Sequence, residues 1–291
     1  MANLINLIVA GLATGAIYAL VAIGFTLLWQ TSQTINFAQG EFVMVPAFFM
    51  LAAMSVGAPF WLGLLIGFAI SLALLGFAFK KVLVDPMLRH GVLPLAIATM
   101  ALSLFMRESV KEFFTAEAQP FPSIVPNVNV EFLGAVVSLQ SIGVLVLAVI
   151  AVAALQYLLG RTSIGHQMQA TAQNPTVARI LGIPVERMIL YTFLINAGLV
   201  ALASILITPI YLAKFSSGEI LGQAAFIAAI VGGFNQVRGA IAGGLLLGVI
   251  DNLGATYVST QYRGAIPLFL LIAVILFRPQ GLLGRAEERT V

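Results

Sequence analysis

Long apolar runs alternate with short polar stretches along the whole chain. A membrane-spanning helix requires about 20 predominantly apolar residues. Nine runs reach or approach this length: 4–28, 36–56, 60–79, 93–113, 142–160, 188–212, 220–236, 239–258 and 264–277. The runs are continuous rather than alternating at every second residue, which favours helices over the strands of a membrane barrel. The pattern therefore predicts an all-α, polytopic integral membrane protein with eight or nine transmembrane helices in a single domain, residues 1–291.

Several of these runs are not regular spans. The fourth carries Arg107, Glu108 and Lys111 near its end, and the last three runs are short. A short run fits either a complete crossing or a half-helix that turns back inside the membrane. We therefore expect some of the helices to be broken or re-entrant.

The composition excludes most soluble classes of protein. Hydrophobic residues make up 60% of the 291 positions and charged residues only 9%, against about 25% charge in a typical soluble domain. Such a chain cannot cover its surface with polar side chains in water, which excludes a soluble enzyme. The net charge of +3 is not gathered into a basic stripe, so no nucleic-acid partner is expected.

The same composition leaves little room for catalysis or metal binding. The chain has no cysteine and two histidines, which excludes disulfides, thiolate metal sites and cysteine nucleophiles. Ser216, Ser217 and His166 are scattered and form no pattern typical of a hydrolase. We therefore expect no catalytic residues, no metal site and no cofactor bound by this chain.

Basic residues gather in the loops that follow the third, fifth, seventh and last spans. Ten of the 14 lie there: Lys80, Lys81, Arg89, Arg161, Arg179, Arg187, Arg238, Arg278, Arg285 and Arg289. Because inner loops of membrane proteins are enriched in Lys and Arg, nine crossings would place the N-terminus outside and the C-terminus in the cytoplasm. Omitting one crossing would reverse the N-terminus only. Residues 114–141 would then form an external loop, which fits either a contact with an external partner or a simple connector.

The polar segment 161–187 is long for an inner loop and has the pattern of a short helix with defined ends. Asn174 is suited to cap the first free N–H groups, and Pro175 fits the first helical position. Gly182 suits the left-handed position after the helix, and Pro184 prevents its continuation. Three residues between them form one apolar stripe: Val177, Ile180 and Leu181.

Two interpretations of this short helix remain open. An amphipathic helix of this kind lies on the lipid surface or docks in a groove of a cytoplasmic protein. The dipeptide Gly-Lys does not occur in the chain, so the chain lacks a Walker A motif for ATP. If ATP drives transport, the ATPase is therefore a separate polypeptide, and segment 161–187 is the natural contact for it.

Four stretches in this order resemble the permeases of branched-chain amino acid ABC transporters, of the LivH type. They are GLATGAIYALVAIGFTLLWQTSQTINFAQGEF at 11–42, ARILGIPVERMILYTF at 178–193, AAIVGGFNQVRGAIAGGLLLGVIDN at 228–252 and FRPQGLLG at 277–284. The resemblance implies a complex in the bacterial inner membrane. It would contain two permease subunits, the second a diverged relative, and two ATPase subunits that bind ATP, and an external binding protein would serve it.

The resemblance also assigns residues to the contact with the ATPase. Segment 161–187 is similar to the family's cytoplasmic coupling loop, and Ala178, Leu181, Gly182 and Ile183 match the centre of that loop. Arg179 stands where the family usually has a small or polar residue. With Asn174 and Pro175, which begin the helix, these residues are the predicted ATPase-coupling set.

Polar residues inside apolar spans are costly and favour a functional role. Asn36, Gln39, Gly40 and Glu41 begin the second span and match the family's INFAxGE pattern, which implies pathway lining or gating. The alternative is an interfacial cluster in which Glu41 reaches water.

Asp251 and Asn252 interrupt the eighth span. They line the same path, or Asp251 pairs with Arg263, or they mark a helix end. The family pattern usually has a carboxylate near this point, often Glu.

The resulting hypothesis is a permease subunit for branched-chain or other hydrophobic amino acids, with urea or short amides as alternative cargo. A rival from another class is a secondary transporter driven by an ion gradient, in which Glu41 and Asp251 would be the coupling sites. The segment 161–187 and the lack of clear inverted symmetry argue against this rival.

Overall fold

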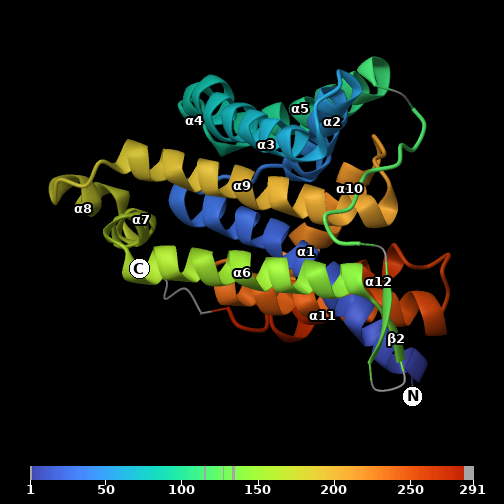
Figure 1. The fold of residues 1–291 in the computed structure, drawn as a ribbon. Helices are drawn as coiled ribbons and strands as arrows, with labels where there is room; N and C mark the ends of the chain where they lie inside the picture. Colours follow the sequence, from blue (N-terminus) through green and yellow to red (C-terminus); the bar gives the residue numbers. More distant parts are fainter. Residues whose placement is uncertain (1, 115, 127, 133–134, 285–291) are drawn as a thin grey trace. The chain divides into compact units, whose positions relative to one another are not determined.

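Helices form most of the computed structural model, which describes residues 2–114, 116–126, 128–132 and 135–284. Figure 1 shows their order along the chain. The helices are α1 Ala2–Ser32, α2 Gln39–Ser55, α3 Phe60–Ser71, the π-helix η1 Leu72–Val84, α4 Asp85–Leu88, α5 Val92–Phe113, α6 Leu139–Arg161, α7 Ser163–Gln173, α8 Pro175–Ile180, α9 Val185–Tyr211, α10 Ser217–Gly232, α11 Val237–Tyr257 and α12 Ala265–Phe277. Each predicted apolar run has become a helix.

A short antiparallel hairpin lies in the segment predicted as an external loop. Its strands are β1, Asn129–Phe132, and β2, Ala135–Ser138, with Asn129 opposite Ser138. The prolines upstream, at 120, 122 and 126, lie in a part without helix.

The membrane class is confirmed, but the number of crossings is not. Within the described residues, six helical segments are long and apolar enough to span a bilayer: Leu4–Ser32, Phe60–Leu88, Val92–Phe113, Leu139–Arg161, Val185–Tyr211 and Val237–Tyr257. Helices α2, α10 and α12 are apolar but have 17, 16 and 13 residues. At about 1.5 Å per residue they are shorter than a hydrocarbon core of about 30 Å, so eight or nine complete crossings stays a prediction.

The chain divides into two compact units, each assembled from separate stretches of sequence. The first unit comprises Met1–Thr26, Ile124–Val149 and Gln223–Val291, and the second comprises Leu27–Ser123 and Ile150–Gly222. The boundaries fall inside α1, α6 and α10, so each of these helices contributes to both units. Each unit is described below by itself.

In the first unit, α1 and α11 pack backbone to backbone through glycines. A Cβ added at Gly15 would lie 2.7 Å from the carbonyl oxygen of Gly244 and 2.8 Å from the Cα of Leu245. A Cβ at Gly11 would lie 2.9 Å from the Cα of Val249. Small residues at four-residue spacing allow such approaches between membrane helices.

In the second unit, α2 packs alongside α9 and runs in the same direction. Gln39 bonds Asn196, and eight residues later Ala47 donates its N–H to Ser204. Helix α3 returns antiparallel to α2, since Gly63 lies on Met54 and Gly67 lies on Met50. The start of α2 is therefore held against the middle of a long helix.

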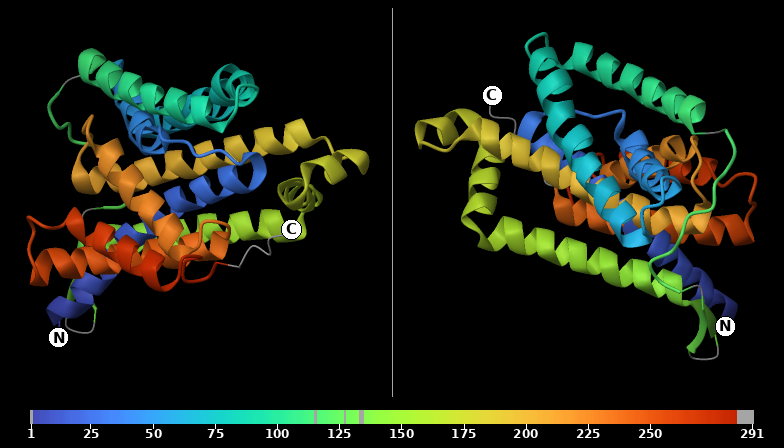
Figure 2. Two further views of the ribbon diagram at one scale, coloured as in Figure 1. Left: turned by 180° about the vertical axis from the view of Figure 1, so that it is seen from behind. Right: turned by 45° about the horizontal axis from the view of Figure 1, so that its top comes forward.

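The third span is longer than the sequence indicated. Helices α3, η1 and α4 continue without interruption from Phe60 to Leu88, and Figure 2 shows α3 and η1 as one continuous helix. Phe79 of η1 packs between Phe42 and Phe193, with ring centroids 4.9 and 5.8 Å away. The apolar run ends before Lys80, but the helix continues past this lysine, which is buried and paired with the carboxylates of Asp85 and Glu186.

Candidate functional site

A buried cluster of side-chain amides holds the start of α2. Gln39 donates through Nε2 to Asn196 Oδ1 at 2.6 Å, and Asn196 donates through Nδ2 to Gln39 Oε1 at 3.1 Å. Asn36 donates to the same Oε1 at 3.3 Å and accepts the N–H of Ala38. All three amide side chains are buried, so they satisfy one another in place of water.

Asn196 belongs to this cluster, although the sequence analysis did not select it. It is an amide inside the otherwise apolar run 188–212. A buried polar group in such a run requires a partner, and this was the available signal. The identity of the partner depends on the packing of α2 against α9, which lies 157 residues away in sequence.

Glu41, two residues after Gln39, is buried beside the first turn of α10. Its Oε1 accepts a long hydrogen bond of 3.5 Å from Ser103 of α5, and its Oε2 has no hydrogen-bond partner among the described residues. With 2% of its surface exposed, Glu41 does not reach the surface of the described chain. The side chain thus carries an unsatisfied acceptor, which is costly when buried.

Glycines bring α2 and α10 into backbone contact around this carboxylate. A Cβ at Gly40 would overlap the carbonyl of Gly218, and a Cβ at Gly218 would overlap Glu41 Oε2. Next to this contact, Arg107 of α5 forms an ion pair with Glu219 of α10. The structure therefore brings together Asn36, Gln39, Gly40 and Glu41 and adds the start of α10 to them.

Asp251 lies in the first unit and forms a separate polar site. Arg263 donates through Nε to Asp251 Oδ1 at 3.0 Å and through Nη2 to Oδ2 at 2.8 Å. Tyr18 of α1 donates to the same Oδ2 at 3.3 Å. The pairing with Arg263 was one of the predicted alternatives. Asn252 differs, because its amide donates to the carbonyl of Gly248 in its own helix at 3.0 Å.

Segment 161–187 contains two capped helices. Thr162 begins α7, accepting the N–H of Gly165 at 3.0 Å. Asn174 begins α8, accepting the N–H groups of Thr176 and Val177 at 3.0 Å each, and Pro175 is the first residue of the helix. The predicted start of the short helix is confirmed.

The end of α8 is also the predicted one. Gly182 has φ of +80°, in the left-handed region, and Ile183 donates its N–H to the carbonyl of Ala178 at 3.0 Å. This six-to-one bond after a left-handed glycine is the usual closure of a helix. Pro184 follows and precedes the first residue of α9.

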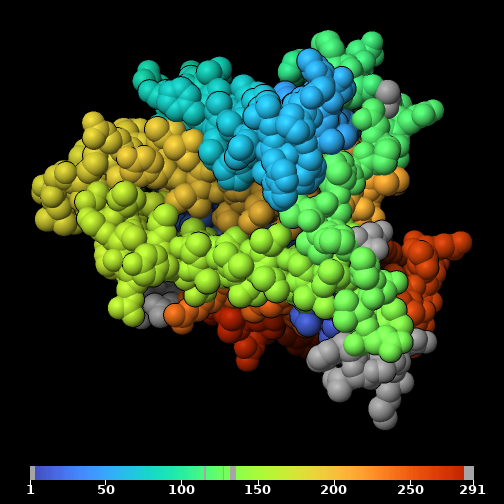
Figure 3. Space-filling view, viewed as in Figure 1, coloured from blue at the N-terminus to red at the C-terminus, as the bar shows by residue number. Residues whose placement is uncertain are grey.

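The apolar side of α8 faces away from the chain. Ile180 and Leu181 are 79% and 72% exposed and Val177 is 48% exposed, whereas Ala178 is buried. Figure 3 shows the olive-coloured atoms of α7 and α8 at the surface of the chain. Ala178 therefore supports the helix from within, and the exposed members of the predicted coupling set are those able to touch a partner.

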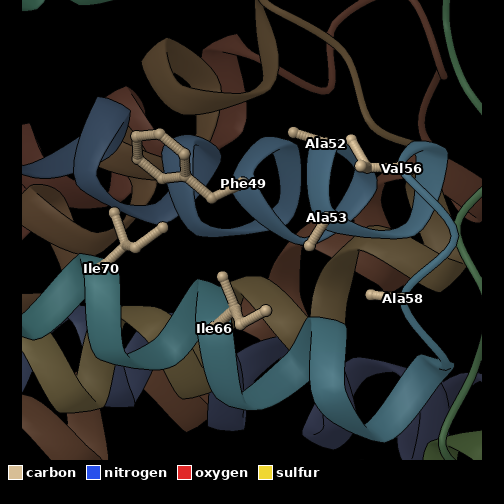
Figure 4. Close-up of a pocket in the computed structure, with 7 residues that line it drawn as sticks. All are labelled: Phe49, Ala52, Ala53, Val56, Ala58, Ile66 and Ile70. Atoms are coloured by element: carbon tan, nitrogen blue, oxygen red, sulfur yellow. The ribbon is translucent and has the colours of Figure 1, made fainter.

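A pocket of about 420 Å³ lies between α2 and α3 (Figure 4). Its lining is entirely apolar: Phe49, Ala52, Ala53, Val56, Ala58, Ile66 and Ile70. It offers no side chain to recognise a charged ligand, so it is not a candidate for selecting one. Among the described residues, no group of three or more His, Asp or Glu is placed to hold a metal ion.

Comparison with known families decides how these features are to be understood. Residues 7–275 match the family described as branched-chain amino acid transport system, permease component. The chain belongs to this permease family. The match covers both units and all of the predicted site residues.

Individual relatives support the same assignment over nearly the whole chain. The permease is 33% identical to the high-affinity branched-chain amino acid transport system permease protein BraD of Pseudomonas aeruginosa, covering 98% of this chain and 97% of BraD. It is 32% identical to LivH of Salmonella typhimurium, covering 97% and 96%. It is 27% identical to the probable LivH of Methanocaldococcus jannaschii, covering 91% and 88%. No solved structure matches the chain.

Proposed function

We propose that this permease is the membrane subunit of an ATP-driven importer for branched-chain or other hydrophobic amino acids. The observation that carries the proposal is the exposed, capped helix α8 in a chain that matches this permease family over residues 7–275. An apolar helix end held out from the protein is suited to insert into a groove of another protein. The full-length relatives are described as branched-chain amino acid permeases.

The proposed complex contains two ATPase subunits, a second, diverged permease subunit and an external substrate-binding protein in the bacterial inner membrane. ATP is bound and hydrolysed by the ATPases, and this chain is not an enzyme. The membrane subunit makes eight or nine crossings, with its C-terminus and segment 161–187 in the cytoplasm and residues 114–141 outside. The predominance of basic residues in the inner loops supports this orientation.

The ATPase contact is assigned to α8 and its closing turn. Leu181 and Ile183 supply apolar contacts, Arg179 supplies charge, and Gly182 shapes the turn between α8 and α9. Asn174 and Pro175 fix the start of the helix, and Ala178 supports it from below. When the ATPases close on ATP, they displace this segment and tilt the attached spans, which changes access between the two sides of the membrane.

The gate is assigned to the backbone contact between α2 and α10. Gly40 and Gly218 allow this contact, and Asn36 and Gln39 hold the start of α2 in place. Separating the two helices would uncover Glu41, whose Oε2 has no partner among the described residues. In the first unit, Asp251 and Asn252 are proposed to line the path, with Arg263 balancing the charge of Asp251.

Reconstitution tests the function directly. The permease, its partner permease, the ATPases and the binding protein are placed in vesicles, and uptake of labelled leucine is measured. We expect uptake to require ATP and the binding protein and to continue without an ion gradient. Uptake that follows a proton or sodium gradient without ATP would reject the proposal in favour of a secondary transporter. If urea or short amides compete for uptake and leucine and valine do not, the transported substrate is urea or a short amide rather than a branched-chain amino acid.

Replacing Gly182 tests the docking contact. A Cβ added at Gly182 would meet no other atom within 4 Å. Its backbone φ of +80°, however, disfavours most other residues, and placing one there costs about 1–2 kcal/mol of conformational free energy. Gly182→Val is expected to weaken ATPase binding roughly tenfold, the factor that corresponds to about 1.4 kcal/mol. Gly182→Asn is the control, because Asn tolerates the left-handed region. Equal ATPase binding by the two variants would contradict the docking role.

A further inference from the structure

Lys80 is an ammonium group buried in the longest apolar helix of the second unit. Only 3% of this residue is exposed, and it lies within η1, which continues α3. A buried cation is strongly unfavourable unless carboxylates pair with it. The partners of Lys80 therefore determine which segments must stay together at this end of the helix.

One partner is local and fixes the lysine within its own helix. Lys80 Nζ lies 2.9 Å from Asp85 Oδ1, and the Asp85 N–H donates to the carbonyl of Lys80. The main chain and the side chains of these two residues are thus joined twice. This pairing holds the ammonium in position whether or not anything else binds it.

The other partner belongs to the segment that leaves α8. Lys80 Nζ lies 3.3 Å from Glu186 Oε2, and Glu186 is in the first turn of α9. The two residues are separated by 106 positions in sequence. This ion pair connects the end of the α3–η1 helix to the residues that follow the closing turn of α8.

Glu186 also faces α8 itself. Its other oxygen, Oε1, lies 4.0 Å from Arg179 Nη2. Both of these side chains are well exposed, so this outer pair is weak, whereas the inner one has a buried partner. Glu186 is consequently paired with the buried Lys80 through one oxygen and directed toward Arg179 of α8 through the other.

The helix that carries Lys80 is of an unusual kind. Helix η1 has π geometry over 13 residues, whereas π-helices are rare, usually a single turn, and frequent at functional sites. It packs closely along α9, where Gly76 lies against Leu194 and Phe79 against Phe193. Together with Glu186 on Lys80, these contacts join the first three turns of α9 to η1 at three positions.

From these contacts we infer that Lys80 is a positioning residue that ties segment 161–187 to the α3–η1 helix through Glu186. The inference rests on the proposed ATPase contact at α8. It adds a route by which displacement of α8 moves the α3–η1 helix. In this arrangement Glu186 is the connection between the two segments, and Asp85 holds the lysine side chain in place.

The variant Glu186→Gln tests this tie without leaving Lys80 unpaired, since Asp85 remains. In the complete reconstituted complex, we expect the leucine transported per ATP hydrolysed to fall roughly fivefold or more, the lower range for coupling between sites. Arg187→Gln is the matched control, because it removes the neighbouring exposed charge, and it should transport normally. Lys80→Met should act like Glu186→Gln, whereas Lys81→Met, at an adjacent exposed position, should not.

A distance measurement separates the tie from a general loss of stability. The chain has no cysteine, so spin labels can be placed at Val82→Cys on η1 and His166→Cys on α7, both exposed positions. With Glu186 present, we expect the label separation to stay the same when ATP binds. In Glu186→Gln it should change on ATP binding, because α7 and α8 then move without η1.

The outcomes distinguish this inference from the proposed function. If the ATPases do not bind or uptake does not use ATP, the proposed function fails, and the tie fails with it. If ATP-driven uptake is seen but Glu186→Gln leaves both the transport ratio and the label separation as in the unmodified chain, the tie is rejected and the function stands. A Lys80→Met, Glu186→Gln double variant that is clearly worse than either single variant would also reject it, because the residues would then act separately.

Discussion

At the scale of single residues, the polar groups of this permease differ in how completely their neighbours satisfy them. Gln39 and Asn196 exchange two hydrogen bonds, and Asp251 receives a two-point contact from Arg263. Glu41 keeps one oxygen without a partner among the described residues. The buried polar groups of the first two arrangements are hydrogen-bonded, whereas Glu41 has a buried acceptor oxygen that still lacks a hydrogen bond.

The buried amide pair leads to a prediction about stability. Asn196→Leu removes both hydrogen bonds to the buried Gln39 amide, so we expect a loss of about 1–3 kcal/mol in the free energy of unfolding. The double variant Gln39→Met, Asn196→Leu should lose less than the sum of the single variants, because neither member of the exchanged pair is left buried without the other. Asn252→Leu is the control, since that side chain bonds only the backbone of its own helix. Unfolding in detergent gives the free energy of unfolding of the unmodified chain and of each variant. Strictly additive losses in the double variant would contradict the pairing.

The ion pair of Asp251 predicts an asymmetry between its two partners. The Asp251 side chain is 5% exposed and that of Arg263 is 35% exposed. Arg263→Met leaves the buried Asp251 carboxylate without its arginine. Breaking a fully buried ion pair in this way lowers the free energy of unfolding by about 3–5 kcal/mol. Asp251→Asn leaves an arginine that reaches water, so its loss should be nearer 1 kcal/mol. Thermal midpoints in detergent compare the two variants, and equal shifts would show that the carboxylate is better hydrated than the structure indicates.

The sequence identified most of these residues, and it offered Arg263 as one possible partner of Asp251, but it did not identify the other partners. Asn36, Gln39, Glu41 and Asp251 were selected because polar groups in apolar runs are costly, and that cost is visible without a structure. Asn196 and the start of α10 were not selected, since their role depends on which helices lie side by side. Lys80 was taken for a loop residue, because its burial depends on two carboxylates that the apolar pattern does not reveal.

At the scale of helices, local rules predicted local features. The start and end of α8 follow from Asn174, Pro175, Gly182 and Pro184, whose effects act over a few residues. The π geometry of η1 and the backbone contact between α2 and α10 have no comparable local signal. The ends of most predicted spans lie within a few residues of the helices found, and the third span was the exception, since it continues to Leu88.

The contact between α1 and α11 predicts strong sensitivity to a single added carbon. Gly15→Ala places a Cβ 2.7 Å from the Gly244 carbonyl and 2.8 Å from the Leu245 Cα, so the helices must separate and lose the packing that holds them. We expect little correctly folded permease, measured by gel filtration of detergent extracts. Gly160→Ala is the matched control, with open space at its Cβ position, and it should behave normally. Similar yields of the two variants would contradict the close approach.

At the scale of the whole molecule, the proposed orientation in the membrane rests on the positions of the few lysines and arginines. The helical membrane class follows from the apolar runs alone, whereas the sides of the membrane follow only from where the lysines and arginines lie. The number of crossings could not be settled by sequence, because α2, α10 and α12 are too short for length to decide. The division into two interleaved units was not predicted, since each unit joins stretches that are distant in sequence.

Labelling of single cysteines tests the orientation in intact cells. The chain has no cysteine of its own, so Val128→Cys and Ile180→Cys, both at exposed positions, can each be introduced alone. A maleimide that does not cross membranes should label position 128 from outside, and position 180 only after the cells are opened. Labelling of both positions from the same side would overturn the assigned topology.

The exposed end of α8 also has a consequence for a cell that makes this protein. Ile180 and Leu181 are 79% and 72% exposed within the part of the chain that the structure describes, and apolar surface of this kind favours unintended association. A subunit made without its ATPase would display this surface continuously, whereas assembly would hide it. The surface proposed to bind the ATPase can therefore also mark unassembled copies for removal, so the amount of permease in the membrane would follow the supply of ATPase.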